Sequence, residues 1–338
     1  MHESLLYTKG KEKSVHCLLC CHYCHILNGG SGRCGVRENK NGVLYSLVYG
    51  QLIAKNVDPV EKKPLFHLLP GSLSYSIATV GCNFSCRHCQ NASISQVKPS
   101  ATENRMPGQL HSAEEVIAAA LASGAESISY TYVEPTIFFE FALDCMKLAR
   151  AQGLKNIFVS NGFMSKEAIE MLVPWLDAVN VDLKAFTDSF YRSICGARLQ
   201  PVLESIQHMQ KAGVLLEVTT LVIPGYNDSE EELQSIAEFL CKLDPVIPWH
   251  VSGFYPTYKM TDRSPTPVAT LEKARETGHR AGLHYVYTGN RPGGGGENTS
   301  CPSCGIEVIL RHGFSIGKNR LHNGCCPSCG QAIHGVWK

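Results

Sequence analysis

The chain has 338 residues, of which 31 are Lys or Arg and 30 are Asp or Glu, so its formal net charge is +1. This balance gives no indication of a nucleic-acid partner, and a hydrophobic fraction of 44% excludes a disordered chain. No apolar run approaches the roughly 18 residues that span a bilayer. Because segment 1–14 is also polar, we expect a cytoplasmic protein without a membrane partner.

Sixteen cysteines, most of them in three tight groups, dominate the composition. Without a signal sequence, such groups indicate metal or cluster ligation rather than disulfides. The first group lies in a loop-rich segment, 1–70, in which 42–53 resembles a hairpin. We expect this Cys-rich module to hold zinc or an auxiliary 4Fe-4S cluster, with Cys21 and His22 as alternative ligands and free thiols as the alternative to a metal. The expected ligands are Cys17, Cys20, Cys24 and Cys34.

Segment 71–290 alternates short apolar strands with amphipathic helices. Six strand–helix units in series predict an α/β fold with a parallel sheet, either a partial (β/α)6 barrel or a curved open sheet. Both place functional side chains at the carboxyl ends of the strands. Strands are predicted at 74–79, 127–132, 156–160, 178–182, 215–221 and 249–253, with a weaker one at 284–287. Helices are predicted at 136–150, 166–173, 201–212 and 267–281, and after the capping motifs 112–115 and 229–232.

A three-cysteine loop directly follows the first of these strands. Cys82, Cys86 and Cys89 have the spacing Cys-x3-Cys-x2-Cys. Three close thiolates can ligate three irons of a 4Fe-4S cluster and leave the fourth iron open, as a catalytic metal site requires. The alternative is a zinc knuckle with His88 or a remote residue as fourth ligand, but the loop has no second Cys-x2-Cys pair.

Beyond a Gly-rich linker at 291–296, the tail 297–338 has few large apolar residues and needs a staple to fold. Two near-identical Cys-x2-Cys-Gly knuckles, 21 residues apart, predict a zinc ribbon closed by four thiolates. A rubredoxin-type iron site is the alternative, and Cys325 competes with its neighbour for one ligand place. The expected ligands are Cys301, Cys304, Cys326 and Cys329.

The cysteine loop and the strand–helix series together resemble the radical S-adenosylmethionine (radical SAM) superfamily over about 74–287. In that superfamily the open iron binds the amino and carboxylate groups of S-adenosylmethionine. An electron passed through the cluster cleaves the cofactor to methionine and a 5′-deoxyadenosyl radical, which abstracts a hydrogen atom from the substrate. The resemblance implies an oxidoreductase-type enzyme that is served by a low-potential electron donor of the flavodoxin or ferredoxin type.

Two further residues fit this resemblance. Glu134 ends the second predicted strand, where superfamily members carry an acid that meets the cofactor's ammonium; here the surrounding segment resembles pyruvate formate-lyase activating enzymes. The alternative is an acid that precedes a helix beginning at Pro135. His88 stands where many members carry an aromatic residue that packs on adenine.

The next two strand ends also carry cofactor candidates. Ser160 and Asn161 follow the third strand and are expected to hydrogen-bond the methionyl carboxylate, with a plain turn as the alternative. Asp182 and Lys184 end the fourth strand and point the same way, as in the activating-enzyme segment that contacts the cofactor. A surface ion pair is the alternative for these two residues.

Further strings resemble one branch of the superfamily, the AmmeMemoRadiSam system radical SAM enzymes, over nearly the whole chain. These strings include 32–37, 57–67, 195–204 and 335–337. The branch implies Memo-like and AMMECR1-like partner proteins and no firm substrate. Within these strings, Lys62-Lys63 is interpreted as a solvated turn rather than as part of a loop over the cavity.

The leading hypothesis is a radical SAM enzyme with a 4Fe-4S cluster, S-adenosylmethionine and zinc as cofactors, and activation of a glycyl-radical enzyme is a narrower form of it. A non-catalytic zinc-binding scaffold and a dithiol redox enzyme are hypotheses from other classes. The scaffold predicts zinc at all three cysteine groups, whereas the dithiol enzyme predicts reversible thiol titration without iron.

Overall fold

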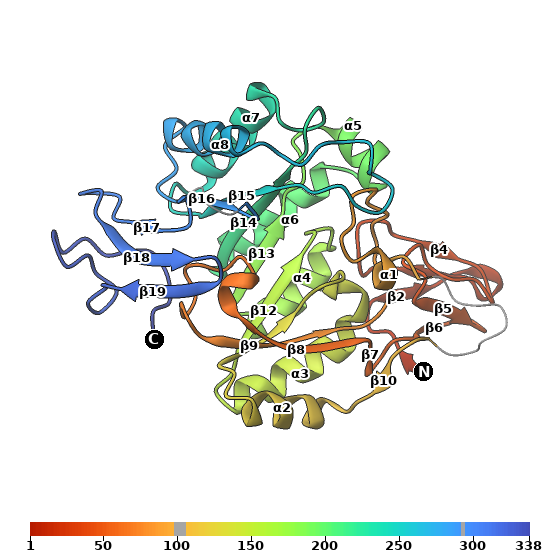
Figure 1. The fold of residues 1–338 in the computed structure, drawn as a ribbon. Helices are drawn as coiled ribbons and strands as arrows, with labels where there is room; N and C mark the ends of the chain where they lie inside the picture. Colours follow the sequence, from red (N-terminus) through yellow and green to blue (C-terminus); the bar gives the residue numbers. More distant parts are fainter. Residues whose placement is uncertain (98–105, 292–294) are drawn as a thin grey trace.

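The computed structural model describes residues 1–97, 106–291 and 295–338. Its largest element is an eight-stranded sheet with the order β16-β15-β14-β13-β12-β11-β9-β8 (Figure 1). Seven of these strands run parallel, and β8 pairs antiparallel with β9 at one edge. The strands are β8 (Ala54–Pro59), β9 (Leu73–Ala78), β11 (Ser127–Tyr130), β12 (Lys155–Ser160), β13 (Ala178–Asp182), β14 (Leu215–Val222), β15 (Trp249–Gly253) and β16 (Val286–Gly289).

The predicted α/β fold with a parallel sheet is confirmed. Strands β13 and β15 have the predicted bounds, and the weaker strand predicted at 284–287 is β16, two residues further along. Strand β8 was not predicted, because its sequence is polar and ends in a proline. Such a sequence suits only the edge of a sheet and carries no apolar period to detect.

Helices connect the parallel strands, with α2 and α3 beside the β9 end of the sheet and α7 and α8 beside the β16 end (Figure 1). The predicted capping box opens α2: Ser112 Oγ accepts a hydrogen bond from Glu115 N at 3.2 Å, and the Glu115 carboxylate accepts one from Ser112 N at 3.0 Å. The α-helices are α1 (Ala92–Ser95), α2 (Ala113–Ala122), α3 (Phe139–Ala151), α4 (Lys166–Leu172), α5 (Asp188–Phe190), α6 (Gln200–Lys211), α7 (Glu230–Leu243) and α8 (Val268–Arg280). The short turns are η1 (Lys11–Lys13), η2 (Val60–Lys62), η3 (Pro135–Phe138), η4 (Val173–Trp175) and the π-helical η5 (Tyr191–Cys195).

The N-terminal segment forms two small antiparallel sheets, β2-β3-β4 and β1-β6-β5. The hairpin between β5 and β6 turns at Asn41 and Gly42, whose φ values of 55° and 86° suit a type I′ turn. The prediction of a hairpin over 42–53 is therefore wrong in its bounds, because the first strand precedes the turn. The strands are β1 (His2–Glu3), β2 (Tyr7–Lys9), β3 (Val15–Cys17), β4 (His25–Ile26), β5 (Arg37–Lys40) and β6 (Val43–Ser46), while β7 (Gln51–Leu52) pairs with β10 (Gln109–Leu110).

A buried ion pair anchors the N-terminal strands to the large domain. The Arg37 guanidinium donates hydrogen bonds of 2.9 and 2.6 Å to the two carboxylate oxygens of Glu140 in α3, and both side chains are 1% exposed. Burial alone would raise the pKa of Glu140, but Arg37 holds it below its usual range. The pair therefore stays ionised, and loss of either partner would leave an uncompensated buried charge.

The C-terminal segment forms a three-stranded sheet of β17 (Thr299–Ser300), β18 (Glu307–His312) and β19 (Ser315–Asn319). It lies on the opposite side of the large sheet from the N-terminal strands (Figure 1). The predicted linker over 291–296 lies partly outside the described residues. Within the described residues, no helix is both long enough and apolar enough to cross a bilayer.

Candidate active site and metal centres

A cavity of about 590 Å³ lies at the carboxyl ends of the parallel strands. Its wall is built from the segments that follow β9, β11, β12 and β13, as the strand-end argument predicts. The structure therefore brings together every residue predicted for the catalytic cluster and for cofactor contacts. These residues are Cys82, Cys86, His88, Cys89, Glu134, Ser160, Asn161, Asp182 and Lys184.

The three-cysteine loop is held by backbone hydrogen bonds to η5. Ser85 N donates to the carbonyl of Cys195 at 2.9 Å, and Arg87 N donates to the carbonyl of Ile194 at 3.0 Å. Before the loop, Gly81 has a φ of 100°, and a β-carbon there would lie 2.6 Å from a methyl group of Val36. The loop therefore depends on contacts with distant segments as well as on its own sequence.

The spacing of the three thiols fits a polynuclear cluster. A single tetrahedral metal ion draws thiolates to about 3.8 Å from one another, whereas the corners of a cubane cluster are wider apart. Among the described residues, only the C-terminal cysteine group brings three or more ligand atoms within 4.8 Å of one another, so Cys82, Cys86 and Cys89 do not meet this condition. No fourth cysteine is among the residues that line the cavity, which leaves a position open for another ligand.

Unpaired polar atoms in the cavity wall also fit a polar ligand. His88 Nδ1 and Thr219 Oγ1 are buried, line the cavity and have no hydrogen-bond partner among the described residues. Burial lowers the pKa of His88 to about 3, so its ring is neutral at physiological pH. Buried polar atoms without partners are rare in folded proteins, and a polar group bound in the cavity would satisfy both of these.

Glu134 is buried, and its carboxylate accepts four hydrogen bonds from Thr136, Ser160 and Asn161. Its Oε1 accepts hydrogen bonds from Thr136 N at 3.1 Å, Thr136 Oγ1 at 2.5 Å and Ser160 Oγ at 2.8 Å. Its Oε2 accepts one from Asn161 N at 2.7 Å. Burial raises the pKa of Glu134, although these four donors oppose the shift. The second oxygen keeps acceptor capacity for a further donor from the cavity.

The side chains of Ser160 and Asn161 donate hydrogen bonds to other residues of the cavity wall. The Ser160 hydroxyl donates to Glu134, and the Asn161 amide donates at 2.7 Å to Oδ1 of Asn83 in the cysteine loop. Both side chains thus hold the acid and the loop in place. The two parent strands, β11 and β12, are parallel neighbours in the sheet.

Asp182 and Lys184 form an ion pair with an Nζ to Oδ2 distance of 2.9 Å. The Lys184 side chain is 14% exposed and that of Asp182 is 38% exposed, so the ammonium is largely buried whereas the carboxylate is open to solvent. Burial alone would lower the pKa of Lys184, but Asp182 and the Cys86 thiol raise it well above its usual range. A charged ammonium with one donor committed to Asp182 therefore faces the cavity beside the cysteine loop.

The interpretation of Lys62-Lys63 as a solvated turn is wrong for Lys63. Its side chain is 2% exposed, lines the cavity and donates to Asp58 Oδ2 at 2.5 Å. Tyr132 also donates to this oxygen, from a backbone with a φ of 62°. Burial lowers the pKa of Lys63 to about 8, although Asp58 opposes the shift. A strained aromatic residue and a buried lysine at one wall are features of functional sites.

Sequence reasoning also missed residues that only folding brings to the site. His250 lines the cavity from β15 and contacts Glu217 Oε2 through Nε2 at 2.6 Å. Glu297 and Phe314 reach the cavity from the C-terminal segment. Cys195, which stood apart from the cysteine groups, is buried, and hydrogen bonding to it lowers the pKa of Cys86. Cys195 begins the string 195–204 of the family resemblance, but nothing in that string placed it at the cysteine loop, and no local motif marks the other three residues because their partners are remote in the sequence.

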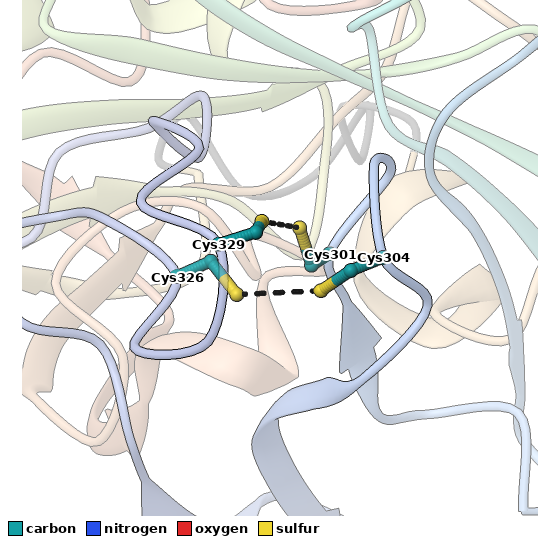
Figure 2. A group of neighbouring side chains, drawn as sticks. All are labelled: Cys301, Cys304, Cys326 and Cys329. Atoms are coloured by element: carbon teal, nitrogen blue, oxygen red, sulfur yellow. Dashed lines mark hydrogen bonds between the residues drawn. The ribbon is translucent and has the colours of Figure 1, made fainter.

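The C-terminal cysteines form a compact four-sulfur group (Figure 2). The Sγ atoms of Cys301 and Cys329 lie 3.6 Å apart, as do those of Cys304 and Cys326. Tetrahedral Zn–S bonds of about 2.3 Å require sulfur separations of about 3.8 Å, so the group fits one metal ion. Cys325 is outside the group, and its thiol contacts the carbonyl of Asn323 at 3.7 Å.

The N-terminal cysteines line a second, smaller cavity. The alternative ligand Cys21 points elsewhere and donates from Sγ to the carbonyl of Met164 at 3.0 Å. His22 borders the cavity, but its Nε2 is 2.8 Å from the carbonyl oxygen of Asn83. The four residues that were expected to act together, Cys17, Cys20, Cys24 and Cys34, all contribute to the wall.

Comparison with known proteins identifies the family. The model of the radical SAM superfamily matches residues 76–240, which include the cysteine loop and the strand ends that line the cavity. An uncharacterized protein of Methanocaldococcus jannaschii is 42% identical over 336 residues, which cover 98% of this chain and 99% of that protein. The chain belongs to the radical SAM superfamily.

More distant relatives of this radical SAM protein have named activities. The pyruvate formate-lyase 1-activating enzyme of Escherichia coli is 23% identical over 167 residues, 46% of this chain and 65% of that enzyme. A putative glycyl-radical enzyme activating enzyme of Methanocaldococcus jannaschii is 25% identical over 187 residues, 53% of this chain and 66% of that protein. The chain is thus homologous to glycyl-radical enzyme activating enzymes over about half its length.

A solved structure supports the fold. Streptococcus suis SuiB bound to S-adenosylmethionine matches with a TM-score of 0.51 and 16% identity, over 68% of this chain and 53% of that one. At this identity the match supports the arrangement of the strands and helices and not a shared substrate.

Proposed function

We propose that this protein reductively cleaves S-adenosylmethionine at a 4Fe-4S cluster held by Cys82, Cys86 and Cys89, and that it abstracts a hydrogen atom from a substrate. The observation that carries the proposal is the shared cavity, which collects the three thiols and the acid, lysine and amide side chains at four neighbouring strand ends. When bound, the cluster and cofactor supply a low-potential electron and a 5′-deoxyadenosyl radical.

The chain's own residues suit the charged ends of this cofactor. The spare acceptor capacity of Glu134 Oε2 suits the cofactor's ammonium, and the free donors of Lys184 suit its carboxylate. Ser160 and Asn161 position the acid and the cysteine loop. Within the loop itself, His88 has a pKa lowered by burial to about 3 and offers a ring nitrogen that has no partner among the described residues.

Activation of a glycyl-radical enzyme is the narrower candidate. It is supported by homology to enzymes that activate pyruvate formate-lyase and benzylsuccinate synthase. Each of these matches covers about half of this chain or less. A flavodoxin-type or ferredoxin-type electron donor belongs to the same proposal. Memo-like and AMMECR1-like partners belong to it too, on the strength of the AmmeMemoRadiSam resemblance.

Anaerobic incubation of the iron-loaded protein with dithionite and S-adenosylmethionine tests the proposal. We expect 5′-deoxyadenosine and methionine, and we expect Cys86→Ala to lower the yield by at least about 100-fold, because the cluster loses one of its three ligands. The matched control is Cys241→Ala, which removes a half-buried cysteine of α7 outside all three groups.

The possible results distinguish the radical SAM proposal from the scaffold hypothesis and from the narrower activating-enzyme activity. Undiminished 5′-deoxyadenosine from Cys86→Ala would overturn the proposal. A colourless protein with zinc at every cysteine group would favour the scaffold hypothesis instead. If cleavage occurs, a glycyl-radical signal on an added candidate enzyme would support the narrower activity, and its absence with several candidates would point to another substrate class.

A further inference from the structure

The N-terminal cysteine group differs from the C-terminal group in its geometry. Both groups consist of four cysteines, but only the C-terminal set has all its sulfur atoms within 4.8 Å of one another among the described residues. The N-terminal sulfur atoms instead surround a small cavity, with Cys17, Cys20, Cys24 and Cys34 in its wall. The chain thus carries one compact and one open four-thiol site.

The N-terminal thiols do not form the compact group that a single tetrahedral ion requires, because no three of their sulfur atoms lie within 4.8 Å of one another. Four thiolates around zinc lie about 3.8 Å apart, which the C-terminal group nearly matches at 3.6 Å. A cubane cluster carries its thiolates on the corners of a larger body, with separations of about 6 Å or more. The three thiols of the catalytic loop share this wider spacing, because they also fail the 4.8 Å condition.

The residues around the N-terminal cysteines supply hydrogen-bond donors that suit a buried, negatively charged metal cluster. Arg37 lines the cavity and is 1% exposed, and its Nε has no hydrogen-bond partner among the described residues. The other guanidinium nitrogens bind Glu140, so this N–H is the donor left for the cavity. Backbone N–H groups also reach the thiols: Arg33 N donates to Cys24 Sγ at 3.5 Å. Such donors stabilise thiolates and the sulfides of a cluster.

The group also abuts the catalytic loop. His22 follows two residues after Cys20 and contacts the carbonyl of Asn83, the residue next to Cys82. On the far side, a β-carbon at Gly81 would come within 3.2 Å of the carbonyl of Cys34. Occupation of the N-terminal site would therefore rigidify the segment that carries the catalytic thiols.

We propose that Cys17, Cys20, Cys24 and Cys34 ligate a second iron–sulfur cluster of the 4Fe-4S class, and not zinc. All four irons then have a protein ligand, so the site is closed, unlike the three-cysteine loop. Arg37 Nε–H donates to this cluster and offsets part of its negative charge. Neither Cys21 nor Cys325 takes part.

Metal analysis of the unaltered chain after anaerobic purification is the first test. Two clusters and one ribbon ion predict about eight iron atoms, eight sulfides and one zinc per chain. Zinc in the N-terminal group predicts about four irons and two zincs, and this result would overturn the proposal. Four irons with one zinc would overturn it as well.

A variant test separates this proposal from the proposed function. The triple variant Cys82→Ala, Cys86→Ala, Cys89→Ala lacks the catalytic ligands and cannot cleave the cofactor, yet it should keep about four irons and the broad cluster absorption near 400 nm. In this background, Cys34→Ala should lose that iron, whereas Cys21→Ala should keep it. Retention of iron by the Cys34→Ala variant, or loss of iron from the triple variant itself, would count against the N-terminal cluster even if the unaltered enzyme cleaves S-adenosylmethionine.

Discussion

The hydrogen bonds around Glu134 require a carboxylate at this position in the cavity wall. Three donors meet one of its oxygens and a single backbone N–H meets the other. Each oxygen must therefore act as an acceptor, and an amide in the same position would present a donor to one of these groups. The arrangement makes the negative charge, and not only the shape, a requirement of the site.

We expect Glu134→Gln to affect both stability and cofactor binding. The amide nitrogen would face Asn161 N, which costs about 1–3 kcal/mol in free energy of unfolding. Loss of the charged acceptor should weaken S-adenosylmethionine binding by about 10-fold or more, since a hydrogen bond to a charged group contributes about 1.5–3 kcal/mol. Urea unfolding and anaerobic titration calorimetry measure the two effects.

Glu126→Gln is the matched control. Glu126 is exposed and directly precedes β11, at the end of this strand that is remote from the cavity. Its substitution should change stability by less than about 0.5 kcal/mol and leave binding unchanged. Wild-type affinity in Glu134→Gln would show that the acid does not meet the cofactor.

The C-terminal ribbon is an element whose hydrophobic cluster is small. Its buried residues include Val308, Ile309 and Ile333, together with Cys301 and Cys326. A cluster of this size needs a further stabilising cross-link to fold. A metal held by the four-sulfur group would provide it by joining the two Cys-x2-Cys segments. Metal binding and folding of the ribbon should therefore be coupled.

Adjacent cysteines test this coupling. Cys326→Ser should remove about one bound metal ion per chain and expose the ribbon to proteolysis, because Cys326 belongs to the compact group. Cys325→Ser should retain the metal and the protease resistance, because its thiol lies outside the compact group and donates to the carbonyl of Asn323. Elemental analysis and limited proteolysis measure both properties. Equal metal loss in the two variants would contradict the ligand assignment.

At the scale of the whole molecule, His67 joins the ribbon to the large sheet. Its Nδ1 lies 2.5 Å from the carbonyl of His334, and its Nε2 lies 2.7 Å from the hydroxyl of Tyr287 in β16. A neutral ring that donates from Nδ1 and accepts at Nε2 satisfies both contacts. Burial lowers the pKa of His67 to about 4, although Glu217 opposes the shift.

This histidine predicts acid sensitivity. In the unfolded chain His67 takes up a proton near the ordinary histidine pKa of about 6.5, whereas burial in the folded chain lowers its pKa to about 4. The stability that neutral His67 contributes is complete above about pH 6.5 and is lost as the pH falls toward 4, with a loss of about 2 kcal/mol by pH 5. Urea unfolding at pH 7 and pH 5 measures this loss.

Two variants isolate the contribution of His67. His67→Gln can still donate to His334 and accept from Tyr287 without titrating, so it should lose about 2 kcal/mol less than the wild type between the two pH values. His312→Gln removes an exposed histidine of the ribbon and should behave as the wild type does. All three proteins keep the same cysteines, so any effect of protonating metal ligands on stability is the same in each and drops out of the comparison. An unchanged pH dependence in His67→Gln would contradict the assignment.

Local patterns made several features predictable. Close spacing along the chain held the thiols of Cys82, Cys86 and Cys89 in one loop, and strand periodicity indicated β13 and β15 with correct bounds. The rule that parallel strands present their carboxyl ends at one edge brought Glu134 and Lys184 into the same cavity. Each inference needed only short-range sequence and a general property of parallel sheets.

Other features depended on contacts between remote segments. Lys63 is buried where Tyr132, from a remote segment, lies with its ring 4.8 Å from the ammonium, and Cys195 meets the three-cysteine loop because η5 packs there. The spacing of cysteines along the chain could not distinguish an open site from a compact one in the two outer groups. Only folded backbone positions set those sulfur separations.

The amino-acid sequence by itself determined the parallel sheet, the three-cysteine loop and which strand-end residues line the cavity with it, because spacing and periodicity act over a few residues. The tertiary structure decided which walls close the cavity, which of Cys325 and Cys326 joins the ribbon group, and that Cys17, Cys20, Cys24 and Cys34 line one small cavity. Those outcomes depend on packing between segments that lie far apart along the chain, for which no local pattern exists.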